Sequence, residues 1–184
     1  ASDEVRPYEN IIMGVDTSGS GADETSFTIV GTLNGYIYVL YSSGQGAYSK
    51  GYSEDILTHL VNKAKEFQVK EIFVESNLGS GMIADLLKPL LNKEYPCTVT
   101  EARASGQKEL RIIDTLEPIM NRHRLIFDRK VIERDYENLP EAAPETEQVT
   151  YRLMYQLARI TREKGALAHD DRLDSLELAV RQVA

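Results

Sequence analysis

The 184-residue chain has few of the features that would place it outside the cell or in a membrane. Its one cysteine, Cys97, excludes an internal disulfide framework and a zinc site made of several cysteines. No apolar run approaches the roughly 20 residues that cross a bilayer, and the acidic first ten residues lack the apolar stretch of a signal peptide. We therefore expect no membrane association and a reducing, intracellular setting.

The chain also lacks an excess of positive charge. It has 21 Lys and Arg residues against 29 Asp and Glu residues, a formal net charge of −8. This balance disfavours a protein that coats DNA, but it does not exclude a nuclease, because a metal-dependent nuclease needs clustered carboxylates. Positive charge is concentrated in residues 103–134 and 152–164. The candidate contacts to DNA phosphates, with ordinary surface patterning as the alternative, are Lys108, Arg111, Arg159, Arg162 and Lys164.

The hydropathy pattern predicts a sheet that begins with antiparallel strands. Residues 11–15 form a short continuous apolar run, typical of a strand buried on both faces. The β-rich runs 27–33 and 36–41 flank Asn34-Gly35, which is the strongest short signal for a hairpin. Further short strands are predicted at 72–74, 97–100 and 125–127.

Helical spacing of apolar residues predicts the elements between and after these strands. We expect Pro89 to bend one of these helices, Pro118 to interrupt another, and residues 138–148 to form a loop. The predicted helices cover residues 56–67, 82–91, 110–120, 151–163 and about 171–183. This order of elements predicts an α/β fold with a mixed central sheet, an antiparallel hairpin plus parallel strands, flanked by helices. We expect one domain over residues 11–184, preceded by a linker or terminal appendage at 1–10.

Acidic residues fall at the ends of two predicted strands and at the start of the last predicted helix. Asp16 ends the first strand, and Glu75 ends the strand at 72–74. If these strands are parallel neighbours, both carboxylates emerge at the sheet edge where sites form in open α/β sheets. At the start of the last helix, Asp171 and Asp174 are about 60° apart around the axis, so they share one side.

Each of these acids also has a simple structural interpretation. An acid after a strand is usually a turn residue. Asp170 can cap the last helix, and the charge of Asp171 in its first turn can be stabilised by the helix dipole. His169 fits an ordinary loop histidine. Taken together, however, converging carboxylates repel one another, and a divalent cation removes the repulsion. Oxygen ligands suit Mg²⁺ or Mn²⁺ rather than zinc, and two such ions can flank a scissile phosphate.

The motifs IIMGVDTSG, VESN and HDDRLDSL, together with the longer stretches around them, resemble the nuclease domain of the large terminase subunit of tailed bacteriophages. The likeness is greatest to short-tailed phages that package concatemeric DNA, and it covers residues from about 8 to 183. The resemblance implies a ribonuclease H-like fold. It also implies a metal-dependent endonuclease that cuts double-stranded DNA with little sequence preference, when packaging starts and when the capsid is full.

The same resemblance implies roles for particular residues and partners. Asp16 would bridge two Mg²⁺ or Mn²⁺ ions, Glu75 would be the second acid, and Asp171 and Asp174 would form the Asp-x-x-Asp pair of the last helix. Whether Asp170 or Asp171 is the nearer metal ligand stays open. The implied partners are double-stranded DNA, the packaging ATPase domain of the same subunit, the portal protein and the small terminase subunit, in the host cell cytoplasm during phage assembly.

Two alternatives to this function remain. The chain has no Gly-x4-Gly-Lys-Ser/Thr motif, so we expect an excised domain without ATPase activity. Such a domain could act mainly as a docking module for the portal or other terminase parts, with weak nuclease activity. The other alternative is a Holliday-junction resolvase-like nuclease, which shares the ribonuclease H-like fold and the acids.

Overall fold

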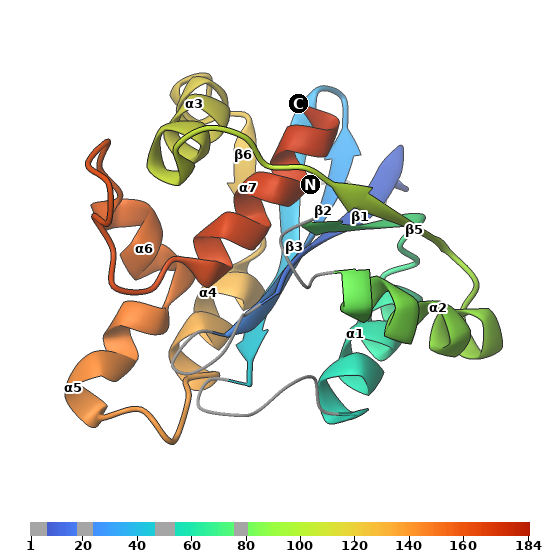
Figure 1. Cartoon of the computed structure of the whole chain (residues 1–184). Coiled ribbons are helices and arrows are strands. Elements are labelled where there is room, and N and C mark those ends of the chain that lie inside the picture. The colour runs from blue at the N-terminus through green and yellow to red at the C-terminus, as the bar shows by residue number, and fades with distance from the viewer. Residues whose placement is uncertain (1–6, 18–23, 47–53, 76–80) are drawn as a thin grey trace.

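A computed structural model describes residues 7–17, 24–46, 54–75 and 81–184, and shows a six-stranded mixed sheet in the strand order β5-β4-β1-β2-β3-β6 (Figure 1). Strands β1 and β2 pair antiparallel, as do β2 and β3, whereas the pairs β1–β4, β4–β5 and β3–β6 are parallel. The strands are β1 Asn10–Asp16, β2 Thr25–Leu33, β3 Tyr36–Gln45, β4 Glu71–Glu75, β5 Thr98–Ala102 and β6 Leu125–Phe127. The predicted α/β class and mixed sheet are confirmed.

Helices cover both faces of the sheet (Figure 1). Alternate residues of the central strands point to opposite faces, so that Met13 belongs to the core under α1 and α2 and Ile12 to the core under α3, α6 and α7. The helices are α1 Glu54–Glu66, α2 Gly81–Glu94, α3 Lys108–Asn121, α4 Arg129–Glu137, α5 Glu145–Gln148, α6 Leu153–Arg159 and α7 Asp171–Val183, with the short 3₁₀ helix η1 Val149–Tyr151 before α6. Within the described ranges no helix is long and apolar enough to cross a membrane.

Helix α7 lies unusually close to the middle of the sheet. A Cβ atom at Gly14 would be 2.8 Å from the backbone nitrogen of Ala179 and 2.9 Å from the carbonyl oxygen of Ser175, so only glycine fits at this crossing. Below the crossing, the hydroxyl of Ser175 hydrogen-bonds those of Thr28 and Ser26 at 2.7 and 2.9 Å. Small residues therefore let the helix pack directly on β1 and β2, which fixes where its first turn lies.

The hairpin has the turn that its sequence predicts and an irregularity that the sequence did not indicate. Asn34 and Gly35 have φ values of 53° and 78°, as the tight hairpin turn of this type requires. Between Ile29 and Val30 the register shifts by one residue, because Leu40 of β3 has no partner in β2. The bulge therefore separates the pairs next to the turn, Val30–Val39 to Leu33–Tyr36, from the pairs at the open end of the hairpin, Thr25–Gln45 to Ile29–Tyr41.

The predicted helices differ from the observed ones in several places, and helix α5 lies within the predicted loop 138–148. Helix α3 continues through Pro118 to Asn121, so the predicted interruption is wrong: the proline lies in the last turn, where one missing hydrogen bond is tolerated. The helix predicted at 151–163 is shorter, because Asp135 accepts hydrogen bonds from the Leu153 and Met154 backbone nitrogens and starts α6 there. Helix α4 was missed, although Asp128 caps it through the Lys130 backbone nitrogen at 2.8 Å.

Residues at the predicted linker also contact the sheet. The Tyr8 ring lies 5.5 Å from that of Tyr38, and the Glu9 backbone nitrogen donates to the Thr32 carbonyl at 2.8 Å. Asn10 is the first residue of β1. Residues 8–10 thus pack with the domain, while residues 1–6 lie outside the described part of the chain.

Candidate metal centre

Four carboxylates that the sequence singled out converge at one edge of the sheet. Asp16 and Glu75 end the parallel neighbours β1 and β4, whose register pairs Val15 with Val74. Helix α7 begins at the same edge with Asp171 and Asp174. The side chain of Asp16 is close enough to Glu75 for a hydrogen bond. It also interacts electrostatically with Asp171 and Asp174. All four residues are buried, with exposed fractions of 5, 6, 8 and 3% for Asp16, Glu75, Asp171 and Asp174.

This crowding of buried acids changes their affinity for protons. Burial raises the pKa of Asp16 well above its usual range, and the charges of Asp174, Asp171 and Glu75 raise it further. Burial also raises the pKa of Asp174 to about 7, against the opposing effect of Lys108. A cation that binds these carboxylates would therefore compete with protons.

Helix α3 places two cations against these acids. The Lys108 Nζ atom lies 2.8 Å from Asp174 Oδ2 and 3.2 Å from Asp170 Oδ1. The Arg111 guanidinium lies 3.7 Å from Glu75 Oε1 and 3.8 Å from Asp174 Oδ1. Burial lowers the pKa of Lys108, but Asp174 and Asp170 outweigh burial and hold the pKa above its ordinary value. These two predicted DNA contacts therefore face the carboxylates.

The residues just before α7 have other partners. Asp170 occupies the capping position of α7, but its side chain makes no capping hydrogen bond and instead pairs with Lys108. The His169 ring stacks on Tyr151 with centroids 4.0 Å apart. Asp170 thus shares Lys108 with Asp174, and the capping interpretation of its side chain is wrong.

The other three predicted DNA contacts lie outside the carboxylate centre. The Arg159 guanidinium lies 4.1 Å from the centre of the Tyr155 ring, and Arg162 makes exposed ion pairs with Asp114 and Glu117. The exposed Lys164 lines a cavity of about 530 Å³ together with Lys108 and Asp170. Lys164 is therefore the member of this group that the structure places next to the centre.

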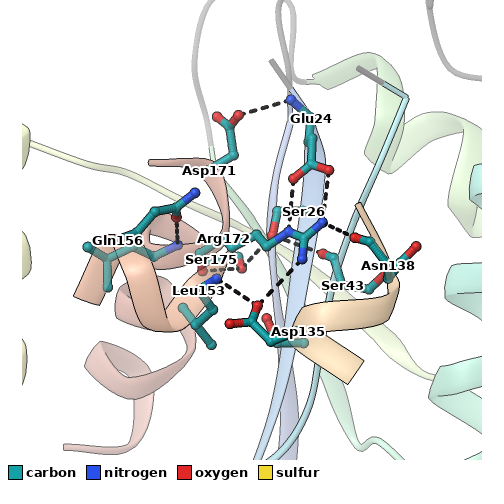
Figure 2. A network of polar contacts seen from close by, with 12 residues as sticks. Glu24, Ser26, Ser43, Asp135, Asn138, Leu153, Gln156, Asp171, Arg172 and Ser175 are labelled. Carbon is teal, nitrogen blue, oxygen red and sulfur yellow. Dashed lines mark hydrogen bonds and ion pairs between the residues drawn. The ribbon is translucent and has the colours of Figure 1, made fainter. Parts of the chain in front are cut away.

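A buried ion-pair network, which the sequence did not reveal, supports the first turn of α7 (Figure 2). Glu24 links two neighbouring residues of the helix. Its backbone nitrogen donates to Asp171 Oδ2 at 2.9 Å, while its carboxylate accepts from the Nε and Nη2 atoms of Arg172 at 2.9 and 3.0 Å. A side chain at Gly44 would collide with this carboxylate.

Arg172 extends the network to the segments that precede α6. It is 1% exposed, lies 3.6 Å from Asp135 Oδ1, and donates to the Asn138 carbonyl oxygen. Because Asp135 also caps α6, one guanidinium connects the residue before β2, helix α4 and the start of α6 to the helix that carries the acids. A buried arginine in the first turn of a buried helix needs an acidic partner, but the sequence alone does not identify that acid.

Glu177 is a further buried acid that the sequence analysis missed. It is 1% exposed and lies one turn after Asp174 on α7. Thr115 donates to its carboxylate at 2.9 Å, Arg181 lies 3.1 Å from it, and Arg111 Nε lies 3.5 Å from it. Glu177 therefore has a hydroxyl donor and two guanidinium groups around its carboxylate.

The donor atoms of the centre fit a hard divalent cation. Both carboxylate oxygens of Asp174 are buried and face the α3 cations without a well-formed hydrogen bond, and oxygen-rich sites suit Mg²⁺ or Mn²⁺. Among the described residues, however, no three Asp, Glu, His or Cys side chains already stand as a ready set of ligands. Coordination would therefore require carboxylates to turn from their present partners, such as Lys108 and the Glu24 backbone nitrogen, towards a shared ion.

Comparison with known proteins shows similarity to phage terminases. Residues 15–125 match the family model described as Terminase Bacteriophage T7, Ribonuclease H-like domain. Over 173 residues the chain is 45% identical to the large terminase subunit of Enterobacteria phage T3, and the match covers 94% of this chain and 29% of that protein. The chain thus spans less than a third of that relative.

Solved terminase structures share the fold. The large terminase of a thermophilic bacteriophage has a TM-score of 0.58 at 17% identity, covering 97% of this chain and 41% of that one. The Mn-soaked terminase nuclease domain of human cytomegalovirus has a TM-score of 0.64 at 13% identity, covering 100% of this chain and 88% of that one. At these identities the two structures show a common fold.

The raised pKa of Asp174 predicts an unusual pH dependence for the metal-free protein. Because Asp174 binds its proton more tightly in the folded state than in the unfolded state between pH 3.8 and about 7, its contribution to stability falls as the pH rises through this range. His59, whose pKa is lowered by burial, contributes in the opposite direction, so the effect of Asp174 is read from the difference between wild type and variant. At about pH 8 in EDTA, Asp174→Asn should be more stable than the wild type by about 1 kcal/mol or more. Urea unfolding measures both effects. The exposed control Asp85→Asn should not change stability in this way, and an Asp174→Asn variant that gains no stability relative to the wild type between about pH 5 and 8 would contradict the prediction.

Loss of Arg172 should destabilise the protein strongly. Arg172→Met leaves Glu24 and Asp135 buried without their cation, which costs about 3–5 kcal/mol of unfolding free energy. The matched control Arg162→Met removes exposed ion pairs and should cost less than about 1 kcal/mol. Denaturant unfolding compares the two variants, and equal losses would show that the buried network contributes no more than a surface pair.

Proposed function

The chain belongs to the ribonuclease H-like domain family of the bacteriophage T7 terminase, and we propose that it is the endonuclease domain of a phage terminase large subunit. The observation that carries this proposal is the convergence of Asp16, Glu75, Asp171 and Asp174 in one buried centre at the sheet edge. Buried acids that raise one another's pKa destabilise a fold unless a cation or a proton offsets them, so their retention favours a role in catalysis.

The proposed reaction is hydrolysis of a phosphodiester bond. Two Mg²⁺ or Mn²⁺ ions, held by Asp16, Glu75 and the acids that begin α7, would activate the attacking water and stabilise the leaving oxygen. Asp16 ends the central strand between Glu75 and α7, which suits the carboxylate that bridges both ions. Asp171 and Asp174 serve as ligands from the helix, with Asp170 beside them on the Lys108 side. Cleavage would leave 3′-hydroxyl and 5′-phosphate ends.

We propose concatemeric double-stranded DNA as the substrate, bound through its phosphates with little sequence preference. Arg159 and Lys164 are exposed and Arg162 is held only by exposed ion pairs, so these side chains are available to the DNA backbone. Lys108 and Arg111 lie at the acids, so a phosphate that they contact would lie at the centre or next to it. In the sequence, acidic residues are concentrated outside this set, for example in residues 135–147.

The proposed partners follow from the longer relatives. Because the chain spans 29% of the phage T3 subunit and 41% of the thermophilic phage protein, we propose that a packaging ATPase domain belongs to the same subunit. The portal protein and the small terminase subunit would join it in the host cell cytoplasm during phage assembly. In the alternative of a docking module, the domain would bind these partners and cut DNA weakly by itself.

Asp16→Asn should abolish cleavage and leave the fold intact. Loss of a ligand shared by two ions removes several kcal/mol of transition-state stabilisation, about a 10²-fold or larger loss of rate. The melting temperature in EDTA should stay equal or rise, because one buried repelling charge is gone. The measurement is cleavage of linear duplex and four-way junction DNA in Mn²⁺, with Asp85→Asn as the exposed control.

The outcomes separate the candidate functions. Full activity of Asp16→Asn would refute the proposed centre. Wild-type cleavage of the junction in strong preference to the linear duplex would favour the resolvase-like alternative. Wild-type cleavage of neither DNA, with binding to portal or ATPase domain intact, would favour the docking module.

The proposed DNA contacts predict a salt dependence. Each real phosphate contact releases counterions, so Lys164→Ala and Arg159→Ala should each flatten the log–log dependence of DNA affinity on salt by about one unit of slope. Binding is measured in Ca²⁺ or EDTA so that cleavage does not interfere. Lys93→Ala, at the exposed end of α2, is the control, and a variant with an unchanged slope is no phosphate contact.

A further inference from the structure

The α3 cations stand where the metal ions of the proposed centre would be expected to act. Lys108 lies 2.8 Å from Asp174 and 3.2 Å from Asp170, and Arg111 lies within 3.8 Å of Glu75, Asp174 and Glu177. The three acids at Arg111 come from β4 and from two successive turns of α7. One face of α3 therefore neutralises much of the charge that the sheet edge and α7 bring together.

The two cations are held differently. The Arg111 side chain is 12% exposed and lies between three carboxylates, so it cannot turn towards another partner without leaving them. The Lys108 side chain is 41% exposed and borders the cavity of about 530 Å³ that Lys164 and Gly165 also line. Lys108 can therefore leave the acids without repacking the core, whereas Arg111 cannot.

Lys108 and a divalent ion compete for the same side of Asp174. An Mg²⁺ or Mn²⁺ ion would lie about 2.1 Å from a ligating carboxylate oxygen, closer than the ammonium group of Lys108 now lies to Asp174 Oδ2. Two cations on one buried oxygen would repel each other strongly at such distances. Binding of an ion through that oxygen thus requires the ammonium to move away.

We propose that Lys108 is a displaceable counter-cation of the carboxylate centre: it holds Asp170 and Asp174 in the metal-free protein and must be released from Asp174 when a divalent ion binds. Arg111 is the fixed counterpart, which stays between β4 and α7 in both states. The inference rests on the proposed function, because it takes the acids to be the divalent-ion site. It adds that the protein weakens its own affinity for the ion, and that the released lysine becomes free for a DNA phosphate beside Lys164.

Lys108→Met tests this competition through metal affinity rather than activity. An opposite charge within about 4–6 Å changes the affinity of a carboxylate for a proton by tenfold or more, and we expect a comparable effect on a divalent ion. Lys108→Met should therefore bind Mn²⁺ about tenfold more tightly than the wild type in isothermal titration calorimetry. Its melting temperature should be lower than the wild type's in EDTA, and saturating Mn²⁺ should shrink this difference.

Two further variants separate charge from side-chain loss. Lys108→Arg keeps a cation at the site and should bind Mn²⁺ with nearly wild-type affinity. Lys93→Met removes a lysine from the exposed last turn of α2 and should leave both the affinity and the melting temperature unchanged. Lys108→Gln gives the same comparison if Lys108→Met does not fold.

The possible results distinguish the inference from the function on which it rests. If the wild type binds no Mn²⁺ by calorimetry and shows no melting shift, the proposed metal centre itself fails. If the wild type binds Mn²⁺ and Lys108→Met binds it equally or more weakly, only the inference is overturned, and Lys108 instead organises the ligands. Tighter binding by Lys108→Met together with wild-type-like Lys108→Arg supports the displaceable counter-cation.

Discussion

Repulsion between carboxylates that are buried together is the constraint around which this domain is arranged. Asp16, Glu75 and Asp174 are brought to one sheet edge by two parallel strands and the start of α7, and each is nearly excluded from water. The fold offsets the repulsion with cations from α3 and with retained protons. The same imbalance is what a divalent ion would relieve, so the feature that weakens the fold also supplies the proposed chemistry.

The parts of the fold that local sequence specifies were predictable. Asn34-Gly35 encodes a turn with positive φ at both residues, and the apolar positions of α7 follow a helical period from Leu173 to Val183. The convergence of Asp16 and Glu75 also follows from local reasoning, because the carboxyl ends of parallel neighbours share an edge. Only the pairing of the two strands had to be assumed.

Features that depend on partners distant in the chain were not predictable. Lys108 and Arg111 look like surface cations in the sequence, and only the packing of α3 against α7 turns them towards Asp174. Arg172 needs Glu24, which is 148 residues away, and the sequence offers several other acids as candidates. Helix α4 escaped notice for a related reason: most of its residues are polar and its few buried positions are fixed by α6 and β3.

The unpaired Leu40 decides which residue lies beneath the Arg172–Glu24 pair. Beyond the bulge, Ser26 faces Gly44, whereas continuation of the register near the turn would set Ser26 opposite Ser43 and move Gly44 one step along the strand. The side-chain-free position would then no longer lie beside the Glu24 carboxylate, and the guanidinium could not close on it. One extra residue in β3 thus places a glycine at the point where the buried Arg172–Glu24 pair leaves no room for a side chain.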